Sequence, residues 1–215
     1  MAADFESMVG FPFTCGAIDG SIIEIQRPYD FEGWYCRKGY PALNMQAVVD
    51  ARRRFISFTA CPGSMNDKAV YNSSGIANSM KIPAGYYLVG DAGYTLSPKL
   101  LIPYPITLEM SREDSHFNYR HSQTRIKVEG AFGMLKNRFR LLKTVLSYEP
   151  DRCATMVQAC LILHNMMIQF QDCVIIDEVG LGDVEYQEPE EQPASNDLGH
   201  TIRDNIRSYM MQIYE

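Results

Sequence analysis

The stretch TCGAIDGSIIEIQRP, residues 14–28, predicts a β segment that carries an acid among apolar residues. Ile18, Ile22 and Ile23 are β-branched and favour a strand. Asp19 lies between them, and a carboxylate is costly to bury beside apolar residues unless a cation neutralises it. Asp19-Gly20 is also typical of a hairpin turn, because both residues tolerate positive φ. Taken alone, the turn is the commoner explanation of this dipeptide.

Two more acids occur in similar surroundings. Asp91 lies in VGDAGY, residues 89–94, and Glu129 lies in RIKVEGAFG, residues 125–133. Three converging carboxylates would supply the oxygen ligands that hard divalent cations prefer. Such a site is suited to cutting or joining phosphodiester bonds. We therefore expect Asp19, Asp91 and Glu129 to be catalytic and metal-binding residues.

Each of these two acids also has a simpler structural explanation. Asp91 would be a turn residue whose side chain bonds its own backbone, although ligands bind at the carboxyl ends of strands in open sheets. Glu129 would pair with Arg125 on a helix, which is worth a few tenths of a kcal/mol. However, Gly130 and Gly133 would each cost about 1 kcal/mol inside a helix. Their presence indicates close approach by backbone, metal or substrate.

The pattern of apolar residues predicts strands followed by helices. Further strands are expected at 43–49, 55–60 and 86–89, the first two joined by a basic turn at 50–54. Helices are expected at 64–79, 115–146, 154–170 and 201–214. In the first helix Ser64 would be the N-cap, and Asp67 would be an N-terminal acid favoured by the helix dipole. This order predicts an α/β fold, a mixed sheet flanked by helices.

Length and charge indicate one domain and a tail. The 215 residues are expected to form a domain at 1–171 and an acidic, flexible tail with a short helix at 172–215. The net charge of −6 argues against nucleic acid, but the tail carries eleven acids and two arginines, so that residues 1–171 have a balance of +3. No secretory signal or membrane span is recognisable, and the cysteines and histidines lack zinc-finger spacing.

Basic residues gather around the third acid. Residues 120–143 include seven basic residues and only one acid, Glu129. They could neutralise a phosphate backbone, although a solvated helix face is the commoner explanation. The candidates for DNA contact are Lys38, which would otherwise be an ordinary loop lysine, and Arg125, Lys136 and Arg138.

Several short motifs occur in an order that is specific in combination. They are FPF at 11–13, GAIDG at 16–20, RKGY at 37–40, PGSMND at 62–67, GDAGY at 90–94, VEG at 128–130, RFR at 138–140 and LHN at 163–165. Together they resemble the Harbinger-type DDE transposase family (PIF/Harbinger, IS5-like) and its transposase-derived nucleases. The resemblance extends from about residue 11 to residue 170.

The resemblance implies a ribonuclease H-like fold and a DNA endonuclease dependent on Mg²⁺ or Mn²⁺, with two ions expected. Asp19, Asp91 and Glu129 match the family's catalytic positions, and strand transfer could accompany hydrolysis. It also implies a nuclear location, with the cytoplasm as a further option. Self-association is left open.

One departure from the family supports a rival hypothesis. Members usually carry an N-terminal helical region of DNA-binding character, whereas about eighteen residues precede Asp19 here. The expectation is therefore either a nuclease that works with a separate DNA-binding partner protein, or a catalytically silent, domesticated transposase remnant that binds DNA or protein in the nucleus. The acidic tail would then serve as the interaction segment.

Overall fold

The computed structural model describes residues 2–29, 32–171 and 197–214. Within them a mixed five-stranded sheet has the order β3-β2-β1-β4-β5. The strands are β1 (Thr14–Glu24), β2 (Ala42–Val49), β3 (Phe55–Pro62), β4 (Tyr87–Val89) and β5 (Leu100–Leu101). The first three pair antiparallel, and β4 and β5 run parallel to β1. The predicted mixed α/β fold is confirmed.

The centre of the sheet is closed to water on both faces. Every residue of β2 is buried, including the polar Asn44 and Gln46. Strand β1 extends beyond β4, because Ala17 pairs with Val89 while β1 continues to Glu24. A crevice therefore opens beside the second half of β1, where β4 ends and the chain leaves the sheet. In open α/β sheets such a position favours ligand binding.

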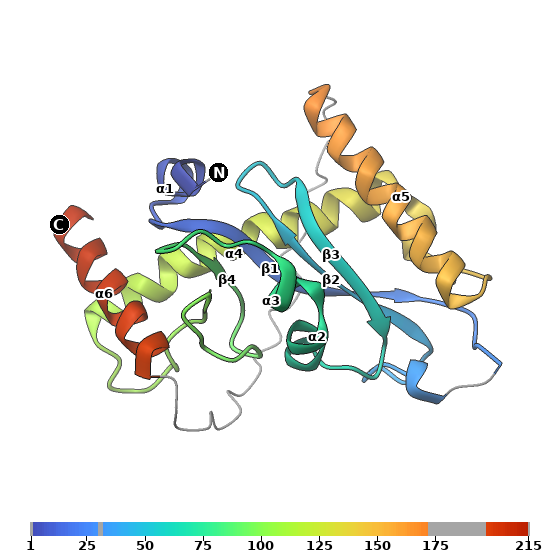
Figure 1. The fold of residues 1–215 in the computed structure, drawn as a ribbon, viewed down its shortest axis with the longest axis horizontal. Helices are drawn as coiled ribbons and strands as arrows, with labels where there is room; N and C mark the ends of the chain where they lie inside the picture. The colour runs from blue at the N-terminus through green and yellow to red at the C-terminus, as the bar shows by residue number, and fades with distance from the viewer. Residues whose placement is uncertain (1, 30–31, 172–196, 215) are drawn as a thin grey trace.

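Helices cover both faces of this sheet (Figure 1). They are α1 (Ala2–Val9), α2 (Asp67–Ser73), α3 (Gly75–Ser79), α4 (Arg112–Arg138), α5 (Pro150–Gln169) and α6 (Asp197–Tyr214), with short 3₁₀ turns at Glu32–Trp34 and Arg140–Lys143. The long α4 passes behind the sheet and contacts β1, β2 and β4, whereas α2 and α3 lie in front of it. Side chains of β1 can thus meet α4 on one face and α2 on the other.

The β segment predicted at 14–28 contains β1, and the alternative of a turn at Asp19-Gly20 is excluded, since both residues pair within the sheet with Ala47 and Gln46. Three other local predictions were wrong. The helix expected at 115–146 ends at Arg138 and is followed by a 3₁₀ turn at Arg140–Lys143. The expected helix at 64–79 is two helices, because the side chain of Ser74 accepts a hydrogen bond from the Ile76 N–H and begins α3. Asn66, not Ser64, caps α2, so Asp67 is its first residue. Helix α1 and strand β5 were not predicted.

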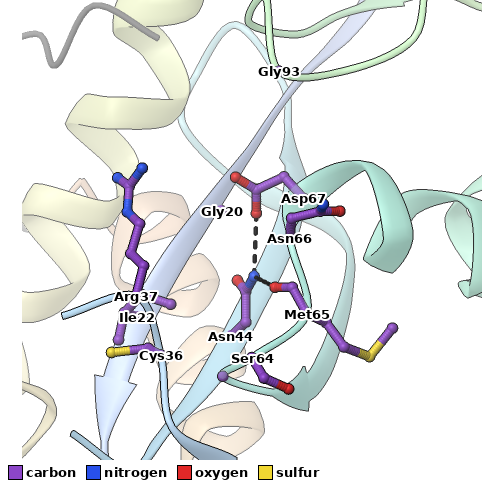
Figure 2. Close-up of a pocket in the computed structure, with 11 residues that line it drawn as sticks. Gly20, Ile22, Cys36, Arg37, Asn44, Ser64, Met65, Asn66, Asp67 and Gly93 are labelled. Carbon is purple, nitrogen blue, oxygen red and sulfur yellow. Dashed lines mark hydrogen bonds between the residues drawn. The ribbon is translucent and has the colours of Figure 1, made fainter. Parts of the chain in front are cut away.

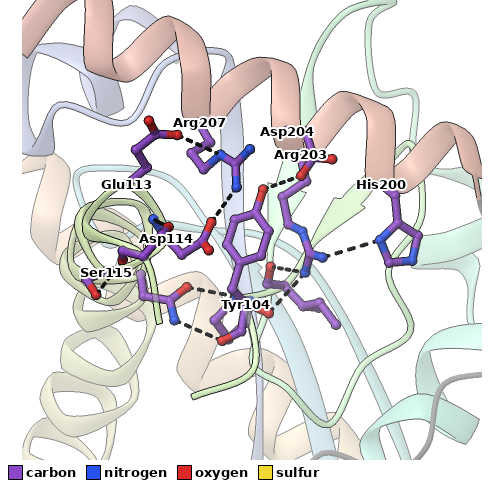
Figure 3. A network of polar contacts seen from close by, with 12 residues as sticks. Tyr104, Glu113, Asp114, Ser115, His200, Arg203, Asp204 and Arg207 are labelled. Carbon is purple, nitrogen blue, oxygen red and sulfur yellow. Dashed lines mark hydrogen bonds and ion pairs between the residues drawn. The ribbon is translucent and has the colours of Figure 1, made fainter. Parts of the chain in front are cut away.

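The C-terminal helix packs on the body of the domain. Helix α6 begins at Asp197, four residues before its predicted start, and contacts α4 and β5. Figure 3 shows its arginines around Tyr104, with the guanidinium of Arg203 3.9 Å from the ring centroid and Arg207 Nη1 2.5 Å from Asp114 Oδ1. The rest of the expected tail, residues 172–196, lies outside the described residues. No helix in the described part of the chain is long and apolar enough to cross a bilayer.

Candidate active site

Three acids from three elements surround one arginine. Asp19 lies in the middle of β1, Asp91 follows β4, and Glu129 and Arg125 lie one turn apart on α4. Arg125 Nη2 is 3.4 Å from Asp19 Oδ2 and 3.2 Å from Glu129 Oε1. Burial opposes the charge of Arg125, but the charges of Asp19, Asp91 and Glu129 raise its pKa. All three predicted acids therefore act on one guanidinium.

Asp19 has a strongly perturbed carboxyl group. Its side chain is 17% exposed, and its Oδ1 accepts a hydrogen bond of 2.8 Å from the Gly20 N–H. Burial raises the pKa of Asp19 to about 7; the Arg125 charge opposes this shift and the Asp91 charge adds to it. A further cation nearby would stabilise the charged form of this carboxyl group.

The local contacts of Asp91 and Glu129 agree with their simpler explanations. Asp91 Oδ1 accepts from the Gly93 N–H at 3.0 Å, as expected of a turn residue. Glu129 forms the i,i+4 pair with Arg125 and remains 41% exposed. These contacts hold both carboxylates in place and leave Glu129 accessible to a ligand.

A fourth acid, Asp67, lies on the opposite face of β1. Its Oδ1 accepts from Asn44 Nδ2 at 3.2 Å, and a Cβ on Gly20 would stand only 2.3 Å from that oxygen. Burial raises the pKa of Asp67; the Asn44 bond opposes this shift and the charge of Asp91 adds to it. The sequence suggested only a helix-end acid here. The missed signal was a pair of polar residues, Asn44 and Gln46, in a strand of otherwise apolar residues.

A pocket of about 400 Å³ opens next to these acids, at the crevice beyond β4. Figure 2 shows Asp67 and Asn44 on one side of it and Arg37 on the other. Gly20, Ile22 and Gly93 also line the pocket, which places it beside Asp19 and Asp91 in the chain. Asp67 is the acid that lines this crevice, whereas Asp19, Asp91 and Glu129 are not among its lining residues.

Three of the predicted DNA-contact residues lie on α4, and Lys38 lies in the loop before β2. Lys136 Nζ donates to the Ile22 carbonyl at 3.0 Å, and burial lowers its pKa to about 8, with the charges of Lys38 and Lys143 adding to the shift. Lys38 is exposed, whereas Arg138 is half-buried and its charge contributes to lowering the pKa of His164 on α5, an effect that is mainly due to burial. Arg125 therefore contacts the acids directly, Lys136 lies against β1 at Ile22, and Arg138 lies toward α5.

Residues 18–165 match the family model described as DDE superfamily endonuclease. The chain belongs to this family. The Harbinger-type family predicted from the motifs is thereby confirmed, and the mixed sheet with its helices is consistent with the family's ribonuclease H-like fold. Family membership supports a nuclease-type function for this DDE-family chain.

Relatives with curated descriptions cover most of the DDE-family chain. "Protein ALP1-like" of Arabidopsis thaliana is 33% identical over 195 residues, which are 81% of this chain and 48% of that protein. "Putative nuclease HARBI1" is 31% identical over 172 residues in Mus musculus, 77% and 49% of the two chains, and 30% identical over 217 residues in Bos taurus, 97% and 60%. The chain thus spans about half the length of the curated relatives it matches. No solved structure gives a significant match.

Proposed function

We propose that the chain is a DNA endonuclease that hydrolyses phosphodiester bonds with Mg²⁺ or Mn²⁺ at Asp19, Asp91 and Glu129. The observation that carries the proposal is that Arg125 lies within ion-pair distance of both Asp19 and Glu129, while the charge of Asp91 acts on the same guanidinium. Acids from β1, the end of β4 and α4 need not meet for the fold to be stable. Their arrangement around a cation therefore supports a binding role.

The residues fit divalent metal ions in their chemistry. All three donors are carboxylates, and the raised pKa of Asp19 reflects a buried acid in need of positive charge. In the described part of the chain no group of three acids, histidines or cysteines is arranged to hold a metal ion, and Arg125 supplies the positive charge. Asp19, Asp91 and Glu129 would hold the ions, which when bound activate water or a 3′-hydroxyl and stabilise the leaving oxygen.

The remaining residues would bind and orient the substrate. The Gly20 and Gly93 N–H groups hold Asp19 and Asp91 by their Oδ1 atoms. Arg125 would neutralise the phosphate that is cleaved, and Lys38 and Lys136 would bind phosphates next to it. Strand transfer, a nuclear location and a separate DNA-binding partner belong to the same proposal.

One observation favours the rival function, a catalytically silent module that binds DNA or protein. Arg125 bridges Asp19 and Glu129 directly, as in an ion-pair network that needs no metal. In that case the acids would stabilise the fold and metal ions would have no effect. The two functions therefore differ in their response to metal.

A thermal-shift measurement tests the proposal. Mg²⁺ or Mn²⁺ at about 100 times its Kd should stabilise the folded state by roughly 2.7 kcal/mol, since the ion binds only that state. For a chain of this size the melting temperature should rise by about 5 to 10 °C. In Asp91→Asn the rise should be much smaller. An equal rise in both proteins, or none in the wild type, would favour the rival function.

A further inference from the structure

The end of α5 holds the turn between β2 and β3. Asn165 Oδ1 accepts from the Phe55 N–H at 2.9 Å, and Asn165 Nδ2 donates to the Phe55 carbonyl at 2.8 Å. His164 Nε2 donates to the Arg53 carbonyl at 3.0 Å. The LHN motif is thus used to fix this turn, which contains Arg52, Arg53 and Arg54.

The three arginines of the turn differ in their partners. Asp50 Oδ2 accepts from Arg54 Nε at 2.7 Å, and Arg52 lies 3.8 Å from Asp4 of α1. Arg53 has a left-handed backbone with φ of 64°, a conformation that costs energy for a residue other than glycine. The tertiary contact from His164 helps to hold this backbone, and the turn directs the Arg53 side chain toward α4.

The Arg53 guanidinium lies on α4 at Gly130. A Cβ at Gly130 would stand 3.1 Å from Arg53 Nε, which is closer than nine in ten real Cβ contacts. Arg53 Nη1 donates to Met134 Sδ at 3.7 Å, a weak acceptor. Among the described residues no carboxylate lies within ion-pair distance of Arg53. Gly130, which is costly inside a helix, is explained by the room it leaves for this side chain.

A second cation lies on the same face of α4. Lys127 is one turn before Gly130, where the Arg53 guanidinium lies, so the two cations share this face of α4. Neither cation has an ion pair with an acid in the ranges that the structure describes, and an anion would stabilise both. The neighbouring face of α4 carries Arg125 and Glu129, the proposed cleavage residues.

We propose that Arg53 and Lys127 form a binding site for a backbone phosphate of DNA, beside the cleavage site, and that His164 and Asn165 are positioning residues for it. The inference rests on the proposed function for the identity of the anion. The glycine at 130 and the LHN motif are then both requirements of one phosphate site.

Fluorescence anisotropy with a labelled DNA duplex, in EDTA and at a series of NaCl concentrations, tests this site. Loss of one phosphate contact lowers the slope of log K against log[salt] by about 0.9. Arg53→Gln should show that loss. Arg152→Gln, which removes an equal charge beside Tyr148 at the other end of α5, should keep the wild-type slope. Equal slopes in wild type and Arg53→Gln would overturn the inference.

Two further variants separate positioning from overall stability. Gly130→Ala should shift the Arg53 guanidinium by a few tenths of an ångström and lower the slope by less than Arg53→Gln does, although alanine favours helix. Asn165→Ala should also lower it, with no further loss in the double variant with Arg53→Gln. Unchanged slopes in folded Gly130→Ala would contradict the positioning. A wild type that binds DNA with this pattern but does not cut it would reject only the nuclease function.

Discussion

At the scale of single residues, His121 couples the stability of the fold to pH. It is fully buried on α4, and its ring contacts Phe11 and Phe117. Burial lowers the pKa of His121 to about 3, and the charge of Arg125 adds to the shift. The unfolded chain therefore binds this proton at a higher pH than the folded chain. The stability that His121 contributes is complete above its ordinary pKa, near 6.5, and is lost as the pH falls toward 3.

His121→Leu should make the protein less sensitive to acid. Between pH 7.5 and pH 4.5 the wild type should lose roughly 2 to 3 kcal/mol more unfolding free energy than the variant, because only the wild type must exclude this proton. Urea unfolding at the two pH values measures the difference. His200→Leu, an exposed position on α6, is the control and should follow the wild type. An equal loss in His121→Leu would contradict the account.

The candidate site could be predicted from the sequence only in part. Asp19, Asp91 and Glu129 stand out because carboxylates among glycines and apolar residues are uncommon; Asp19 and Glu129 pair with Arg125, and the charge of Asp91 acts on it. Asp67 was not recognised as part of the same group. Its contact depends on the pairing of β1 with β2 and on the missing Cβ of Gly20, neither of which is visible along the chain.

At the scale of elements, strand β1 and helix α2 meet at Gly20. Gly20→Ala would place a Cβ 2.3 Å from Asp67 Oδ1, so the carboxylate or the start of α2 must move. We expect a loss of roughly 1 to 3 kcal/mol, the usual cost of overpacking, measured by thermal unfolding. Gly75→Ala is the matched control, because only Ser79 atoms at 3.9 and 4.0 Å lie near its Cβ position. Equal stability of the two variants would show that Asp67 adjusts freely.

The elements that were predicted well are those with a strong apolar pattern. Strands β2 and β3 and their basic turn have the predicted arrangement, and α5 was recognised from its apolar residues. The division between α2 and α3 was missed, because a serine does not interrupt the apolar pattern of a helix. Ser74 caps α3 because its backbone is extended, which the sequence does not show. Strand β5 has two residues, too few to leave a periodic signal.

At the scale of the whole molecule, α6 closes the domain next to β5 and α4. Arg203 is only 5% exposed, and its Nη1 donates to the carbonyl of Pro103 at 3.2 Å while its guanidinium lies on the Tyr104 ring. The sequence shows an amphipathic helix here but not its docking site, since the partners lie about 100 residues earlier in the chain. The packing of α6 on the domain was not predicted, because the acidic composition of the tail favoured a flexible segment.

Arg203→Ala should therefore destabilise the whole domain. The variant loses a buried cation–π contact and bonds to carbonyls, which together are worth roughly 2 to 4 kcal/mol. Thermal unfolding should show a drop of about 4 to 16 °C. Arg152→Ala, whose guanidinium lies 5.7 Å from the Tyr148 ring centroid on the exposed start of α5, should change the melting temperature much less. Similar losses in both would mean that α6 does not stabilise the domain.

Nicking of supercoiled plasmid DNA tests the central claim most directly. Wild type and Asp91→Asn, purified identically and checked for equal melting behaviour without metal, are incubated with plasmid in Mg²⁺, in Mn²⁺ and in EDTA. The account predicts nicking by the wild type that requires metal and is lost in Asp91→Asn. Absence of nicking by the folded wild type, or equal nicking by both proteins, would contradict a nuclease built on Asp19, Asp91 and Glu129.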